Sequence, residues 1–253
     1  MPTPAEAVAD HGFAVIPDLI AAATAAELAG AVERASAAAA GSLRRDEAVY
    51  GMRDLLRGVP EVRALAGSAA VIDWVEAILG PGAFAVRGLW FDKTPAANWG
   101  VPWHQDLTIA VRERADAPGF GPWTSKGGIP HVRPPVTVLA AMVTVRVHLD
   151  DCGPGRGPLQ VIPGSHRAGR LDAAAIRLAV AATPAVDCLV GRGGAVLMRP
   201  LILHSSRAAT EPDRRRVIHL EYAAGPLPGG LAWFEAVAPP PPPPPPPAGR
   251  AIS

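Results

Sequence analysis

From about residue 83 onward, short β-prone segments alternate with turns rich in Gly and Pro, and this pattern constrains the fold most strongly. Its clearest member is residues 137–150, where Val, Leu, Met and Thr predominate and predict a strand. Many short strands separated by turns are typical of a double-sheet barrel. We therefore expect a mainly β core with helical cover (α+β), with further strands at 83–92, 158–166, 185–190, 195–198, 201–205 and 214–223.

The N-terminal part, residues 18–80, is predicted to be largely helical. Thr24 followed by Glu27 has the spacing of a capping box, which predicts a helix over 25–40. Residues 50–56 are ambiguous. A short strand at 11–17 precedes this part, and further helices are expected at 60–66, 68–79 and 172–181.

Length and composition favour one soluble domain with a short tail. We expect residues 1–237 to form a single domain, with a barrel core at about 83–224. The net charge of +1 gives no reason to expect nucleic acid or an anionic membrane as a partner. No signal peptide or apolar span is apparent, so a cytoplasmic location is expected. Residues 238–253 are predicted to be a disordered, proline-rich tail, and Pro239–Pro247 could bind a partner domain as polyproline II.

Residues 101–107 contain His104 and Asp106 two positions apart. Side chains at positions i and i+2 of a strand point to the same face, so the imidazole and the carboxylate would converge. They form two-thirds of a 2-His-1-carboxylate site of the kind that holds Fe(II) with open coordination positions. His204 is the best candidate for the third ligand.

A cationic side chain follows this histidine at Arg215. A 2-oxo acid cosubstrate needs a fixed cation for its far carboxylate, and the planar fork of arginine pairs with a carboxylate in two places. Ser206 could share that carboxylate through its hydroxyl. Three arginines are consecutive, so strand alternation admits either Arg215 or its two neighbours, Arg214 and Arg216.

Residues 108–136 are irregular and rich in Gly, Pro and Trp, which indicates a long functional loop. We interpret them as an active-site lid, with a surface Ω-loop as the alternative. Trp123, Lys126 and His131 are candidate substrate contacts on this lid. His148 shares a strand face with Arg146, and both either line the pocket or form a satisfied polar pair in the core.

The chain resembles the phytanoyl-CoA dioxygenase family, which includes ectoine hydroxylase. The matching elements are residues 12–17, Lys93, the Trp-His-Gln-Asp of 103–106, residues 157–166 and the spacing from His204 to Arg215. The resemblance implies a double-stranded β-helix (a jelly-roll, cupin-like barrel), Fe(II) and 2-oxoglutarate with O₂, and ascorbate as an accessory reductant. It implies that His104, Asp106 and His204 bind iron, and that Arg215 and Ser206 bind 2-oxoglutarate.

Two positions depart from the family pattern. Arg146 stands where relatives often carry Trp beside the cosubstrate, and Arg156 stands where they usually carry Asn. Arg146 and Lys93 are therefore included among the expected cosubstrate contacts, although Lys93 could reach the substrate instead.

The implied reaction is hydroxylation of an unactivated C–H bond of a small molecule, with release of succinate and CO₂. Halogenating relatives lack the carboxylate that Asp106 provides, which favours hydroxylation. Desaturation or epimerisation with the same cofactors is the nearest alternative. A non-catalytic jelly-roll protein that binds a metabolite or metal is the alternative from another class.

Overall fold

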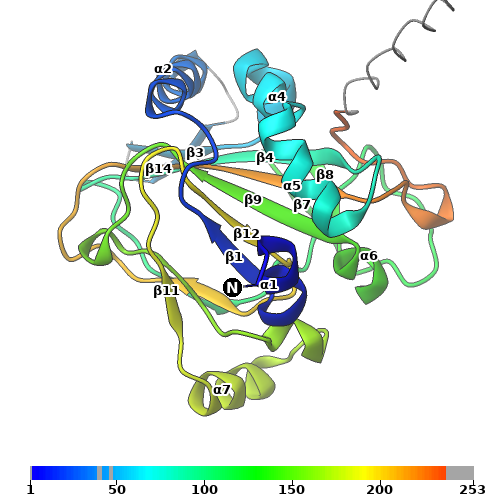
Figure 1. Ribbon diagram of the computed structural model, residues 1–253. Coiled ribbons are helices and arrows are strands. Elements are labelled where there is room, and N and C mark those ends of the chain that lie inside the picture. Colours follow the sequence, from blue (N-terminus) through cyan, green and yellow to red (C-terminus); the bar gives the residue numbers. More distant parts are fainter. Residues whose placement is uncertain (1, 39–41, 46–47, 238–253) are drawn as a thin grey trace, which may run out of the picture.

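Two antiparallel β-sheets form the centre of the molecule (Figure 1). The computed structural model describes residues 2–38, 42–45 and 48–237. Their arrangement is the jelly-roll barrel that the sequence predicts. The larger sheet has the strand order β1 (Phe13–Ile16), β12 (Ala195–Met198), β9 (Met142–His148), β14 (Arg215–Ala223), β4 (Phe84–Lys93), β3 (Ala48–Met52) and β2 (Ser42–Arg45). The smaller sheet has the order β11 (Val186–Cys188), β10 (Leu159–Val161), β13 (His204–Ser206) and β5 (Val101–His104).

Helices and a small third sheet surround this barrel (Figure 1). The third sheet has the order β6 (Ile109–Ala110), β8 (Ile129–Val132) and β7 (Trp123–Lys126). The α-helices are α1 (Pro4–His11), α2 (Ala22–Ala38), α3 (Leu55–Gly58), α4 (Pro60–Ala66), α5 (Ala69–Leu79), α6 (Val136–Ala140) and α7 (Ala173–Ala182). Short 3₁₀ turns are η1 (Pro154–Arg156), η2 (Ser165–Ala168) and η3 (Pro228–Gly230).

The outer face of the larger sheet packs against the helices. Alternate residues of β9 and β14, among them Val145 and Leu220, join a buried cluster with Leu28 of α2 and Val75 of α5. Burying an aliphatic side chain of this size contributes about 1.5–3 kcal/mol. The helical layer therefore holds one face of the sheet, and the opposite face of β4, β9 and β14 is left to the barrel interior.

A separate apolar cluster ties the two sheets together. Val196 and Met198 of β12 pack against Val161 of β10 and Ile202, which precedes β13. All four are buried. The distance between the sheets at this end of the barrel is consequently set by side-chain packing.

The predicted start of the helix over 25–40 is wrong. Thr24 lies inside α2, which begins at Ala22. The backbone N–H groups of Leu19 and Ile20 both donate to the carbonyl of Gly193 at 3.0 Å, which fixes the chain just before the helix. The carbonyl of Ala21 then accepts the first helical hydrogen bond from Ala25. Tertiary contacts thus determine this helix start, ahead of the local capping pattern.

The strand predicted over 137–150 is shorter than expected. Val136–Ala140 forms α6, and the strand β9 begins at Met142. Pro135 precedes the helix, and Arg199 donates to the carbonyls of Ala140 and Met142 at the break. The β-branched residues of this segment are accommodated in one helical turn because Leu139 packs into a core cluster there.

Residues 108–136 are not the irregular loop that the sequence indicates, because they contain the three strands β6, β7 and β8. Trp123 pairs with Val132 and Lys126 with Ile129 across the β7–β8 hairpin. The turn at Gly127 and Gly128 has positive φ at both residues, as a tight hairpin requires. Whether this sheet acts as a lid stays a prediction.

Several predicted elements agree closely with the structure. The helix at 60–66 is α4, and Asp172 caps α7 by accepting from the backbone N–H of Ala175 at 2.8 Å. The structure also contains the β2–β3 hairpin within residues 18–80 and the helix α1 before them, neither of which the sequence indicated. The end of the helix predicted over 25–40 and the predicted tail at 238–253 lie outside the described residues.

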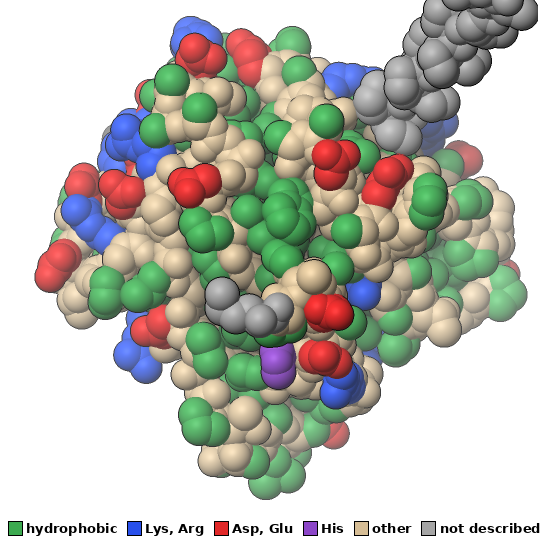
Figure 2. All heavy atoms as spheres, viewed as in Figure 1, with side chains coloured by type: hydrophobic (Ala, Val, Ile, Leu, Met, Phe, Trp, Pro, Cys, Tyr) green, Lys and Arg blue, Asp and Glu red, His purple; other side chains and the backbone are tan. Residues whose placement is uncertain are grey.

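The visible surface carries mixed charge. Figure 2 shows Lys and Arg side chains lying among Asp and Glu side chains over this face of the described part of the chain. Within that part, no helix is both long enough and apolar enough to span a membrane.

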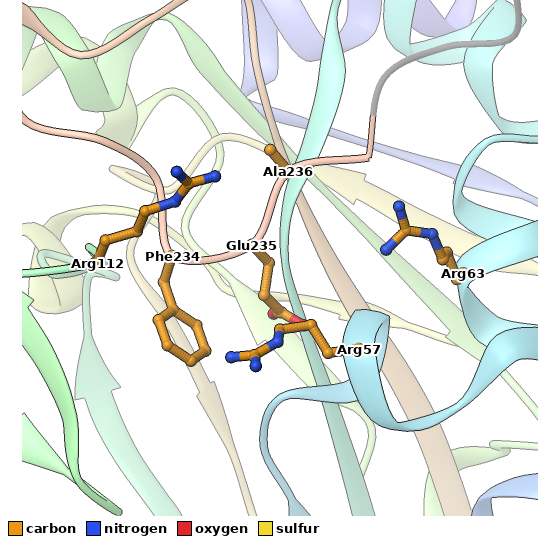
Figure 3. Close-up of a pocket in the computed structure, with 6 residues that line it drawn as sticks. All are labelled: Arg57, Arg63, Arg112, Phe234, Glu235 and Ala236. Carbon is orange, nitrogen blue, oxygen red and sulfur yellow. The ribbon is translucent and has the colours of Figure 1, made fainter.

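The C-terminal segment is fastened to the barrel by Glu235. Its two carboxylate oxygens accept backbone N–H bonds from Leu56 and Gly88, each at 2.8 Å. Glu235 lines a cavity of about 380 Å³ together with Arg57, Arg63, Arg112, Phe234 and Ala236. Figure 3 shows these six residues. Burial raises the pKa of Glu235 to about 7, against the effect of the two N–H donors. This carboxyl therefore joins α3, β4 and the C-terminal segment.

We expect Glu235→Ala to lower the free energy of unfolding by about 2–4 kcal/mol, because two buried N–H groups lose their acceptor. Urea unfolding followed by circular dichroism measures the change. Glu113→Ala, at an exposed position, is the control and should leave stability unaltered. A loss below about 1 kcal/mol in Glu235→Ala would show that other contacts hold the segment.

Candidate active site

Three potential metal ligands converge in the barrel. His104 ends β5, Asp106 follows it, and His204 begins β13. One ligand atom of each residue lies within 4.8 Å of the other two. The His104 and His204 rings are 4.1 Å apart between centroids, because these two residues are paired across β5 and β13. The structure thus brings together the three residues that the sequence selects.

Asp106 reaches this point by a different route from the one expected. The sequence placed His104 and Asp106 on one face of a single strand, but β5 ends at His104. The backbone N–H of Asp106 instead donates to the carbonyl of Pro200 at 2.9 Å, in the segment that leads to His204. A contact with the neighbouring chain segment therefore fixes the carboxylate.

Both histidines are oriented by backbone carbonyls two residues earlier in the chain. The Nδ1 of His104 donates to the carbonyl of Pro102 at 2.8 Å, and that of His204 to the carbonyl of Ile202 at 2.9 Å. A carbonyl can only accept, so the neutral form of each ring carries its hydrogen on Nδ1 and has a lone pair on Nε2. The Nε2 atoms lie 3.9 Å and 3.6 Å from the oxygens of Asp106. Metal-binding histidines are commonly held in this way.

The protonation states also suit a cation. Burial lowers the pKa of His204 to about 4, so this imidazole is neutral at physiological pH. Burial alone would raise the pKa of Asp106, but His204, His219, His104 and Arg87 together lower it. A neutral imidazole and an ionised carboxylate are the forms that bind a metal.

Strand alternation builds the cavity around the triad. The cavity has a volume of about 280 Å³. Every second residue of β4 lines it, and cross-strand partners on β14 line it too. These pairs are Lys93 with Arg215, Leu89 with His219, and Arg87 with Glu221. None of the six residues drawn in Figure 3 belongs to its lining.

The three consecutive arginines divide between the two faces of β14. Arg215 is buried, lines the cavity and donates through Nη1 to the carbonyl of Gly157. Its Nε is buried and has no hydrogen-bond partner in the described structure. Arg214 and Arg216 both pair with Glu33 of α2 on the opposite face. The alternation predicted from the sequence is confirmed.

Lys93 and Ser206 contact each other at this end of the cavity. The ammonium of Lys93 donates to the hydroxyl of Ser206 and to the carbonyl of Arg207, each at 2.7 Å. Burial, with Arg215 and Arg146 nearby, lowers the pKa of Lys93 to about 7. Arg146 also lines the cavity and approaches Nδ1 of His219 at 3.1 Å.

Of the four expected substrate contacts, only Lys126 is among the residues that line this cavity. Trp123 packs at the edge of an apolar cluster beneath the guanidinium of Arg114. His131 is fully buried, and its Nδ1 donates to the carbonyl of Ile129 at 3.0 Å. His148 is buried, and neither of its ring nitrogens has a partner in the described structure.

Sequence reasoning missed part of the cavity wall. Arg87, Leu89 and Phe91 could have been found by counting back from Lys93 in steps of two. Tyr50 and Arg53 could not, because the pairing of β3 with β4 brings their segment to the cavity.

The chain is similar to known proteins in its family and in its fold. The family model described as Phytanoyl-CoA dioxygenase (PhyH) matches residues 8–217. No curated protein sequence gives a significant match.

Three solved structures illustrate the likeness of fold. AviO1 from Streptomyces viridochromogenes Tue57 is 23% identical with a TM-score of 0.65, covering 89% of this chain and 96% of that one. EctD from S. alaskensis with 2-oxoglutarate and 5-hydroxyectoine is 21% identical with a TM-score of 0.70, covering 94% and 80%. SnoK, a non-heme alpha ketoglutarate dependent carbocyclase from nogalamycin biosynthesis, is 18% identical with a TM-score of 0.67, covering 88% and 87%.

Lys93 should leave a signature in the pH dependence of stability. Its pKa is lower in the folded state, so between about pH 7 and pH 10.5 the unfolded chain binds a proton that the folded chain does not. Folded-state stability therefore gains from Lys93 as the pH rises through this range. We expect Lys93→Met to show a smaller rise in the free energy of unfolding from pH 7 to pH 10 than the unaltered chain, measured by urea unfolding. Equal rises would contradict the lowered pKa, and exposed Arg177→Met is the control.

Proposed function

This chain belongs to the phytanoyl-CoA dioxygenase family, and on that premise we propose that it is an Fe(II)- and 2-oxoglutarate-dependent oxygenase of a small molecule. One observation carries the proposal. The Nε2 atoms of His104 and His204 and the carboxylate of Asp106 point to one place, while each Nδ1 is turned away to a carbonyl. Two imidazoles and one carboxylate are the ligand set of open-sided non-haem Fe(II) sites.

The donor set fits an iron ion. Oδ2 of Asp106 is buried without a hydrogen-bond partner in the described structure, and a metal ion would satisfy it. His104 and Asp106 are half-buried and His204 is buried, so the proposed site opens on one side to the cavity. His104, Asp106 and His204 would hold the ion.

The residues at one end of the cavity fit the cosubstrate. Arg215 offers a buried guanidinium whose Nε lacks a partner, and a carboxylate would supply one. The Ser206 hydroxyl and the Lys93 ammonium lie at the same end. We assign the far carboxylate of 2-oxoglutarate to Arg215 and Ser206, with Lys93 and Arg146 as further contacts.

Iron with 2-oxoglutarate, when bound, would supply O₂ activation coupled to loss of CO₂ and formation of succinate. The chain's own part is to hold the reactants. Arg215 fixes the cosubstrate, the carbonyls of Pro102 and Ile202 fix the imidazoles, and the walls built by β4 and β14 limit access of water.

Hydroxylation of a C–H bond is the reaction that we favour. Asp106 completes the ligand set, which leaves no protein-derived vacancy of the kind associated with halogenation. Neighbours in fold include a carbocyclase, SnoK, and an epimerase, SnoN, so the same scaffold carries other outcomes in those proteins.

Iron binding is tested by spectroscopy. Addition of Fe(II) and 2-oxoglutarate without oxygen should produce a weak visible absorption band, because the cosubstrate chelates iron in an open facial site. His104→Ala and Asp106→Ala should abolish or strongly shift the band, since each removes a ligand. His11→Ala, at an exposed position, should leave it unchanged. Absence of the band from the unaltered chain would contradict the proposed binding of Fe(II) and 2-oxoglutarate.

The cosubstrate assignment is tested separately. We expect Arg215→Met to weaken 2-oxoglutarate binding by about 10- to 100-fold through loss of a charge-assisted pair, with iron still bound. Calorimetric titration of the metal-loaded chain measures the affinity. Arg214→Met is the matched control, because this neighbour faces Asp92 and Glu33 instead of the cavity. Equal losses in the two variants would show that the assigned face of β14 is wrong.

A further inference from the structure

The cavity wall carries an excess of positive charge. The cations and carboxylates among its described lining residues are Arg53, Arg87, Lys93, Lys126, Arg146, Arg215, Asp106 and Glu221. Asp106 belongs to the triad, and Glu221 pairs with Arg87 at 2.9 Å. Both carboxylates are thus already engaged, while several cations are not matched. A cavity of this composition attracts anions.

The cations lie at two ends of the cavity. In the register of β14 and β4, Arg215 lies opposite Lys93. Glu221, six residues farther along β14, lies opposite Arg87. Six residues of an extended strand span about 20 Å. The cosubstrate carboxylate that we assign to Arg215 therefore lies far from the Arg87–Glu221 end.

Two cations at the Arg87–Glu221 end lack a carboxylate partner. Arg53, in the segment after β3, makes no hydrogen bond or ion pair within the described structure, and its Nε is buried. Lys126 of β7 donates only to the hydroxyl of Thr108, at 3.1 Å. Both side chains are half-buried. Removing part of an unpaired cation from water costs free energy that a bound anion would offset.

Arg53 and the β7 segment that carries Lys126 lie close together. A Cβ atom placed on Gly127, the residue after Lys126, would lie 3.9 Å from Cδ of Arg53. Burial lowers the pKa of both side chains, and the charge of Arg87 lowers each of them further. Arg53 and Lys126 line the same cavity as Asp106, His104 and His204.

An aromatic wall stands in the same cavity. The rings of Tyr50 and Trp99 meet edge to face at 5.0 Å, and Phe91 lies on the neighbouring strand β4. Such a wall suits a flat or apolar body. The cavity thus combines an anion-binding pair, an apolar wall and the triad.

We propose that Arg53 and Lys126 bind an anionic group of the primary substrate, a carboxylate or a phosphate, and so present the apolar body of that substrate to the triad. The inference rests on the proposed oxygenase function and deepens it by naming the substrate class. It assigns the two cationic ends of the cavity to two different anions, the substrate at Arg53 and Lys126 and the cosubstrate at Arg215.

Calorimetric titration of the chain loaded with Fe(II) and 2-oxoglutarate, without oxygen, tests the proposal. The probes are phenylacetate, phenyl phosphate and the neutral phenylacetamide, which share an aromatic body. We expect at least one acid to bind about tenfold or more tightly than the amide, because a charge-assisted pair adds about one decade or more. The two acids distinguish a carboxylate site from a phosphate site.

Variants locate the binding. Arg53→Met and Lys126→Met should each weaken binding of the preferred acid by about 10- to 100-fold, and Arg53→Lys should recover part of the loss. Affinity for 2-oxoglutarate and the visible band should stay unchanged in all three. Arg177→Met, which removes an exposed cation on α7, should change nothing.

The outcomes are distinct. The inference is overturned if neither acid binds, if the amide binds as tightly as the acids, or if Arg53→Met and Lys126→Met leave acid binding unaltered. It is also overturned if these variants weaken 2-oxoglutarate binding in place of acid binding. A missing visible band with acid binding that still depends on Arg53 would contradict the oxygenase function and retain the anion site.

Discussion

The two-residue alternation of β4, β9 and β14 is the constraint on which the site depends. One face of these strands packs under the helices through residues such as Val145 and Leu220. Because successive side chains of a strand alternate between faces, the other face points into the barrel. Arg146 and Arg215 lie on that face and line the cavity. A one-residue slip in strand register would exchange the side chains of the two faces. The helical cover, although remote from the triad, therefore fixes the composition of the cavity.

The charged residues of β4 and β14 also differ between the two ends of these strands. At one end Arg215 and Lys93 lie together without a carboxylate between them, and burial with mutual repulsion lowers the pKa of Lys93 to about 7. At the other end Glu221 neutralises Arg87. The pairing of Arg87 with Glu221 leaves Arg53 and Lys126 as the unmatched cations there. This distribution supports the proposal of two separate anion sites, one at Arg215 and one at Arg53 and Lys126.

Local sequence patterns correctly predicted features that depend on residues close together in the chain, such as strand alternation and a helix start. The period of two in 214–223 correctly separated Arg215 from Arg214 and Arg216, and Asp172 correctly marked a helix start. The spacing of His104 and Asp106, together with the family resemblance, selected these two residues and His204, although Asp106 lies beyond the end of β5. The failures have a common origin in contacts between distant segments. Thr24 lost its capping role because Gly193 holds the preceding chain, and residues 108–136 gained strands by pairing with one another.

The same distinction applies to the site. Arg53 and Tyr50 lie in a segment whose sequence is ambiguous, and only the pairing of Gly51 and Met52 with β4 brings it to the cavity. His131 and His148 show the converse case. Each has the chemistry of a site residue, yet both are buried without lining the cavity. Chemistry can be read from residue types, whereas access to a cavity is decided by register and by the neighbouring strand.

The two proposed histidine ligands and the proposed cosubstrate arginine belong to different sheets. His104 and His204 lie on paired strands of the smaller sheet, and Arg215 lies on the larger one. The distance between the proposed iron and the proposed carboxylate site is therefore a distance between sheets. Apolar contacts of Val196 and Met198 with Val161 and Ile202 set that distance. Ile202 also contacts a proposed ligand directly, because its carbonyl orients the ring of His204. Core packing and the orientation of a proposed ligand are thus joined at Ile202, so a change in the volume of this cluster would reach His204 through the backbone that holds its ring.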